Sequence, residues 1–132
     1  MNAVSVDVAD MLVADSGLGL TTGTNLFVGK EPTGPKNVVT IYDTYGFPPQ
    51  VTLAGKGEDY YYPSVQVRIR NRDYRTGQSL AQDIMISLHG RAQETWNGTL
   101  YSVIRCMGDP MFMSWDDKQL CHFVVNFDIQ RR

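Results

Sequence analysis

The chain has 132 residues, of which 42% are hydrophobic, 20% charged and 11% aromatic, and its formal net charge is −2. This composition is typical of one ordinary globular domain and excludes a disordered chain or a fibrous repeat. The small negative charge gives no reason to expect nucleic-acid binding over the whole surface, which needs a basic excess. We therefore expect a single domain over residues 1–132.

No stretch of the sequence resembles a membrane anchor or a secretion signal. The longest apolar runs, such as residues 84–86 and 123–125, are far shorter than the roughly 20 residues that cross a bilayer. The first residues lack the basic and apolar regions of a secretory signal. We expect synthesis in the cytoplasm, where Cys106 and Cys121 are thiols by default, although a disulfide between neighbouring strands is geometrically conceivable.

The first predicted element is a helix over residues 3–15. Apolar residues from Val4 to Leu12 recur at the spacing of one helix face, while Asp7 and Asp10 fall off that face. Glycines follow directly, as they do at many helix ends.

Two short strands and a long loop are expected next. β-branched and aromatic residues gather at residues 25–29 and 38–42, between segments rich in turn residues. Residues 46–63 hold prolines, glycines and aromatics without sustained periodicity, so we predict a long loop that has room for a short strand. Loops of this length are uncommon in compact domains and are often functional.

The second half begins with the clearest strand, residues 64–70, where apolar and polar residues alternate strictly. A helix should follow, because Leu80, Ile84 and Leu88 recur at a spacing of four residues and Gly90 stands where a helix stops. Three more strands are expected, at residues 100–107, 111–115 and 120–130. The predicted order is α-β-β-β-α-β-β-β, an α+β fold with a mainly antiparallel sheet and two helices packed on one face.

The sequence offers little support for catalysis or cofactor binding. His89 falls near the predicted end of a helix and His122 on the polar side of a strand. With Cys106 and Cys121 they form no C-x-x-C pair and no pair of histidines at ligand spacing, so we expect no zinc site. We predict a protein that is not an enzyme and has no metal and no cofactor.

One strand carries an unusual run of positive charge. Arg68, Arg70 and Arg72 project from one side at intervals of about 7 Å, and adjacent pairs repel by about 0.6 kcal/mol even in water. A solvated face is one explanation; an acidic patch on a neighbouring subunit or a nucleic-acid backbone is the other, and the net charge favours the acidic patch. Candidate acidic partners, in the same or the next subunit, lie on the first helix: Asp7, Asp10 and Asp15.

The predicted long loop is the second unusual feature, because it combines aromatic and charged residues. Tyrosine rings with a polar tip are favoured at interfaces, although a flap that covers the sheet is the alternative. A methionine-rich segment at residues 107–115 offers adaptable apolar surface, or core. The candidate partner-facing residues of the loop are Phe47, Lys56, Glu58, Asp59, Tyr60, Tyr61 and Tyr62.

The order of these elements is informative. An amphipathic helix, two short strands, a long loop, the strand SVQVRIR at residues 64–70, a helix that begins near QSLA, and a final strand FVVNFDI follow one another. This order resembles the tail terminator proteins of long-tailed bacteriophages, also described as tail completion, head-tail joining or minor capsid proteins. The resemblance spans nearly the whole chain. It transfers no site residues, because the function of this family lies in surfaces.

The resemblance implies a structural virion protein of the tail-neck region, assembled in the host cytoplasm. It would form a ring, commonly a hexamer, that caps the finished tail tube and receives the head. A closed ring needs two different complementary patches, for which the basic strand and the acidic helix are candidates. The implied partners are further copies, a tail tube protein and a head-side neck or connector protein, with DNA passing through the lumen unbound and no membrane. Other neck, tube or baseplate proteins, a nucleic-acid-binding module and a small enzyme are the alternatives.

Overall fold

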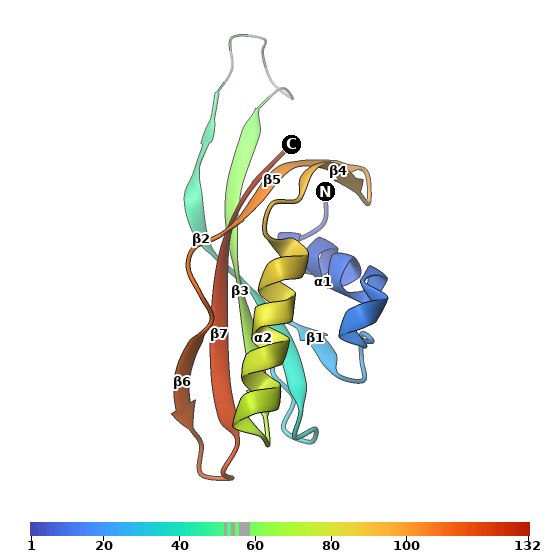
Figure 1. Ribbon diagram of the computed structural model, residues 1–132. Coiled ribbons are helices and arrows are strands. Elements are labelled where there is room, and N and C mark those ends of the chain that lie inside the picture. Colours follow the sequence, from blue (N-terminus) through green and yellow to red (C-terminus); the bar gives the residue numbers. More distant parts are fainter. Residues whose placement is uncertain (52, 54, 56–58) are drawn as a thin grey trace.

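The computed structural model describes residues 1–51, 53, 55 and 59–132. Within these residues it has two α-helices, one short 3-10 helix and seven strands (Figure 1). This content agrees with the predicted α+β class. In chain order the elements are α1 Val4–Ala14, η1 Ser16–Leu18, β1 Leu26–Val28, β2 Val38–Gln50, β3 Tyr60–Asn71, α2 Tyr74–Leu88, β4 Ala92–Trp96, β5 Thr99–Cys106, β6 Met111–Trp115 and β7 Cys121–Arg131.

The strands form one mixed sheet that is mainly antiparallel, as predicted. Its order is β1-β2-β3-β7-β5-β4, and β6 pairs with β7 beside this path. β1 and β2 are parallel, and the other pairs are antiparallel. The centre of the sheet is β3, which pairs with β2 on one side and β7 on the other, so that Val67 lies between Ile41 and Val125.

A single apolar core joins the helices to the sheet. Val8 and Leu12 of α1, Ile84 and Leu88 of α2, and Val67 of β3 are fully buried in one cluster. α1 contacts β1, β2 and β3, whereas α2 contacts β3, β5 and β7. Figure 1 shows the two helices next to each other on one side of the sheet, and they are also in contact. The opposite side carries the polar residues that alternate with the core residues.

Each helix begins at a carboxylate that accepts backbone hydrogen bonds. Asp73 caps α2, since its Oδ2 accepts from the backbone N–H of Thr76 at 2.9 Å. The N-cap of α1, Ala3, has no side chain for this purpose. Asp43 of β2 supplies the missing acceptor: its Oδ1 takes a hydrogen bond from the backbone N–H of Ser5 at 3.0 Å and its Oδ2 one from the Ser5 hydroxyl at 2.6 Å. The helix is thereby attached to the sheet at its N-terminus.

The prediction of a long loop at residues 46–63 is wrong for both of its ends. Residues 46–50 belong to β2 and residues 60–63 to β3, and the arms of this hairpin extend beyond the rest of the chain (Figure 1). Two register shifts, after Thr44 and after Phe47, interrupt the pairing of the arms. Such bulges destroy the two-residue alternation on which a strand prediction rests.

The predicted order also lacks one strand. β4 is short and largely polar and lies at the edge of the sheet, so its sequence AQETW shows no apolar alternation. The connection from β4 to β5 is a two-residue turn of Asn97 and Gly98, both with positive φ, at 50° and 79°. Asn-Gly is a strong hairpin signal, and it identifies β4 in retrospect.

Two further expectations concern cysteines and membranes. Cys106 and Cys121 are free thiols, as expected, with Cys121 buried and Cys106 half-buried. Among the described residues, no helix is both long enough and apolar enough to cross a membrane.

Candidate assembly surfaces

Of the three predicted interface arginines, Arg68 and Arg70 lie on β3 and Arg72 follows it; Arg70 is the most enclosed and is only 7% exposed. Its guanidinium donates to the backbone carbonyls of Pro32, at 2.8 Å, and Pro35. The carboxylate of Glu31 lies 3.6 Å away. These contacts hold the segment between β1 and β2 against the outer side of the sheet, so Arg70 uses its charge within the chain.

Arg68 and Arg72 are more accessible. The guanidinium of Arg68 lies over the ring of Tyr42, 5.7 Å from its centroid, and its Nε donates to Gln66 at 3.0 Å. Arg72 is exposed and lies in the short connection between β3 and α2. Because Arg68 alternates with the core residue Val67, it points to the side of the sheet that the helices leave open.

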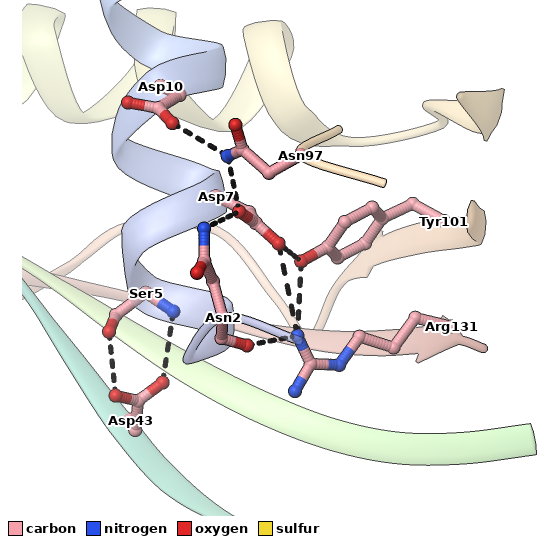
Figure 2. Close-up of polar contacts among 8 residues, drawn as sticks. All are labelled: Asn2, Ser5, Asp7, Asp10, Asp43, Asn97, Tyr101 and Arg131. Carbon is pink, nitrogen blue, oxygen red and sulfur yellow. Dashed lines mark hydrogen bonds and ion pairs between the residues drawn. The ribbon is translucent and has the colours of Figure 1, made fainter. Parts of the chain in front are cut away.

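Asp7, predicted as a surface residue, is fully buried at the centre of a polar network (Figure 2). Its Oδ1 accepts from Asn97 at 2.7 Å and from Asn2 at 3.3 Å. Its Oδ2 accepts from the hydroxyl of Tyr101 and lies 3.9 Å from a guanidinium nitrogen of Arg131. A buried carboxylate is tolerated when both oxygens are satisfied and a cation is near, and both conditions hold here.

The same network connects the two ends of the chain. Arg131 Nη1 donates to the backbone carbonyl of Asn2 at 2.9 Å and to the hydroxyl of Tyr101 at 3.2 Å. Burial, together with the hydrogen bond to Asp7, raises the pKa of Tyr101 above its usual range, so the hydroxyl stays protonated and donates to Asp7. The network therefore fixes α1 against β5 and β7.

The other two candidate aspartates, Asp10 of α1 and Asp15 directly after it, are closer to solvent. Asp10 is exposed and accepts from the side-chain amide of Asn97 at 2.9 Å. Asp15 is half-buried, and its Oδ1 accepts from the backbone N–H of Gly17 at 3.3 Å, which caps η1. Within the described part of the chain, no ion pair joins these aspartates to Arg68, Arg70 or Arg72.

The predicted partner-facing residues lie along the arms of the hairpin. Phe47 is 68% and Tyr61 37% exposed. Asp59, Tyr60 and Tyr62 are half-buried. The residues come from both arms, because Phe47 of β2 is paired with Tyr62 of β3. Two predicted residues lie outside the described residues: Lys56 and Glu58.

Side chains from the ends of the strands brace these arms. The hydroxyl of Tyr62 donates to Gln50 Oε1 at 3.1 Å. The guanidinium of Arg132 lies over the ring of Tyr60, 5.1 Å from its centroid, and donates to its hydroxyl at 3.3 Å. The hairpin is therefore fixed to the C-terminal end of the chain as well as by its own pairing.

The histidines have local structural partners. The Nδ1 of His89 accepts from the backbone N–H of Cys106 at 2.9 Å, and the Nε2 of His122 lies 2.9 Å from Asp116 Oδ2. The contact with His122, together with backbone N–H donors in the turn, lowers the pKa of Asp116 to about 2. No group of three metal-ligating side chains occurs among the described residues.

The chain is similar to known proteins in both sequence and fold. The sequence matches the family model for the bacteriophage tail terminator protein over residues 12–132. The fold is similar to that of a chain in a solved structure titled virion of native gene transfer agent (GTA) particle. The TM-score is 0.68 at 15% identity, over 98% of this chain and 94% of that chain, which shows a shared fold.

No curated protein matches the sequence. The family model, however, covers nearly the whole chain, including the sheet and α2. Members of this family are structural components of phage tails and not enzymes. This chain belongs to the bacteriophage tail terminator family.

Proposed function

We propose that copies of this chain form a closed ring, commonly a hexamer, that caps the finished tail tube and joins the tail to the head. The observation that carries this proposal is the match to the tail terminator family over residues 12–132. The similarity in fold to a chain of a virion particle supports a place in an assembly. We place the ring in the tail-neck region and its assembly in the host cytoplasm.

Ring closure requires two different patches on each copy that fit each other. We assign Arg68, on the open side of the sheet, and Arg72, just after β3, to one patch. Asp10 of α1 and Asp15, just after α1, form the other. Arg68 and Asp10 lie on opposite sides of the sheet, so this pair can meet only between copies. Each exposed ion pair contributes about 0.2–1 kcal/mol, so these charges set the orientation of neighbours more than their affinity.

Asp7 and Arg70 have a different part in this proposal. Their charges are satisfied inside the chain, by the network around Tyr101 and by the carbonyls of Pro32 and Pro35. They would hold α1 and the segment before β2 in the shape that a neighbouring copy recognises.

The hairpin is the proposed contact with the tail tube protein or with a head-side neck or connector protein. A hollow of about 490 Å³ lies at its arms, and Phe47, Tyr61 and Tyr62 are among the residues that line it. Exposed rings beside a hollow suit the insertion of an apolar side chain from a partner. DNA would pass through the lumen without specific binding, in line with the net charge of −2.

Charge reversal tests the ring and its interface. In the variant Arg68→Glu/Arg72→Glu, we expect a folded monomer where the wild type forms a ring, alone or at tube ends. Adding Asp10→Arg and Asp15→Arg to that variant should restore the ring. The measurement is mass by light scattering across concentration, followed by electron microscopy with and without tail tubes.

The control is Arg75→Glu, which reverses an exposed charge on α2 and should leave the ring intact. A ring that survives Arg68→Glu/Arg72→Glu contradicts the proposed charge pairing. A wild-type protein that stays monomeric even with tail tubes contradicts the ring itself.

A further inference from the structure

β6 exposes a contiguous apolar surface. Four of its five residues are large, apolar and exposed: Met111 at 57%, Phe112 at 37%, Met113 at 45% and Trp115 at 48%. Soluble proteins seldom leave such a patch uncovered unless it binds something. The predicted methionine-rich segment is therefore surface along β6.

The aromatic part of this surface is anchored to the core. Tyr74, at the first turn of α2, is 44% exposed and its ring centroid lies 5.3 Å from that of Phe112. Trp115 lies 6.2 Å from Phe112, and the buried Phe123 packs beneath both Tyr74 and Phe112 at 5.1 and 5.7 Å. The rings are held in tilted and edge-on contacts, so the surface is formed before a partner arrives.

The backbone of β6 is also open on one side. Among the described strands β6 pairs with β7 alone, and Figure 1 shows it at the margin of the sheet. Edge strands of soluble proteins usually carry lysine, proline or inward-pointing charges that prevent pairing with another chain. The five residues of β6 have none of these, so its outer N–H and C=O groups can receive a further strand.

The charges at the two ends of β6 indicate what kind of strand fits. Asp109 precedes it, and Asp116 and Asp117 follow it, against the single cation Lys118. Two copies that paired through β6 would place these aspartates beside each other in either direction, which is unfavourable. An extended segment with positive charges at its ends meets an attractive field instead.

We infer that β6 is a strand-addition site for an extended apolar segment of a different protein, with Lys or Arg at the ends of that segment. The added strand would continue the sheet beyond β6 through backbone hydrogen bonds. Its alternate side chains would pack on Tyr74, Phe112 and Trp115. That the segment belongs to another virion protein rests on the proposed function, whereas strand addition itself depends only on β6.

The test uses a synthetic ten-residue peptide of alternating valine and threonine with two lysines at each end. Added to the 15N-labelled full-length protein, it should shift the amide signals of β6 and Tyr74 and slow the hydrogen exchange of β6 amides. The same peptide with glutamates at its ends should bind about ten-fold more weakly.

Two variants of β6 should abolish binding. Met113→Pro removes one backbone donor, and Met111→Lys/Met113→Lys keeps the backbone but places charges on the edge. The control Ile86→Lys alters an exposed apolar residue of α2, 65% exposed, and should bind the peptide as the wild type does.

Equal affinity for the two peptides, or binding without shifts in β6, overturns the inference. The inference is also overturned if the wild-type protein forms a dimer and the variant Met111→Lys/Met113→Lys does not. Peptide binding by a protein that never forms rings would contradict the proposed function and leave the strand-addition site standing. A protein that forms rings but does not bind the peptide would contradict the strand-addition site and leave the proposed function standing.

Discussion

At the scale of single residues, the buried network around Asp7 makes the sharpest energetic prediction. Asp7→Ala removes the acceptor of the Tyr101 hydroxyl and the negative charge beside Arg131, so we expect a loss of about 3 kcal/mol in the free energy of unfolding. Replacing all three by apolar residues of similar size, Asp7→Leu/Tyr101→Phe/Arg131→Met, should recover most of this loss. Urea unfolding followed by circular dichroism measures both.

The control for this network is Asp10→Ala. Asp10 shares Asn97 with Asp7 but is exposed, so its loss should change the free energy of unfolding by about 0.5 kcal/mol or less. A triple variant as unstable as Asp7→Ala would show that the network stabilises the fold through more than the satisfaction of buried charge.

Residue type and spacing predicted which side of a strand Arg68 occupies, but not which charges are buried. Strand alternation is local and needs only neighbouring residues. The partners of Asp7 are remote: Asn97 is 90 and Tyr101 is 94 positions away in the sequence. Arg70 likewise meets Pro32 and Pro35 across 38 and 35 positions. The prediction used charge alone and therefore placed Asp7 and Arg70 at the surface, whereas both are buried.

At the scale of elements, α1 depends on the sheet for its N-terminal cap. Asp43→Ala removes the acceptor of the Ser5 backbone N–H and hydroxyl, and should cost about 1 kcal/mol of stability. Because the cap lies on a different element, the first turn of α1 should also open more readily, which faster amide hydrogen exchange there would report.

Thr44→Ala is the matched control for this cap. Thr44 is the next residue of β2 and is exposed, so its replacement should leave the exchange of α1 unchanged. If Asp43→Ala speeds exchange across β2 and β3 as much as in α1, the carboxylate acts on the sheet and not as a cap.

Elements with regular periodicity were predicted well, and irregular ones were not. Both helices and the centre of β3 follow from apolar spacing, because each has one side in the core. The ends of β2 and β3 are bulged, and β4 is an exposed edge, so neither leaves a period in the sequence. The missed segments are those in which burial does not govern side-chain choice.

At the scale of the whole molecule, element order was enough to suggest the tail terminator family, which the family model confirms. The position of the candidate surfaces could not be predicted in the same way. The order of the strands places β6 at an edge, and the packing of the helices leaves the side of the sheet with Arg68 open. That order depends on pairings such as β3 with β7, which join residues far apart in the sequence.

If neighbouring copies and the tail or head bind different surfaces, a variant can lose head–tail joining and still form rings. In Phe47→Ser/Tyr61→Ser, two exposed rings of the hairpin are lost while Arg68 and Arg72 remain, so rings should still form. Each buried ring at an interface contributes about 2 kcal/mol, so the joining of heads to tails should fall by at least about ten-fold. Electron microscopy counts the rings, and an in vitro head–tail joining assay counts the complete particles.

The control is Ile86→Ser, which removes an exposed apolar side chain from α2 and should reduce neither the number of rings nor the joining of heads to tails. Loss of rings in the hairpin variant would place the hairpin at the contact between copies, and normal joining would exclude it from the contact with the tail or head.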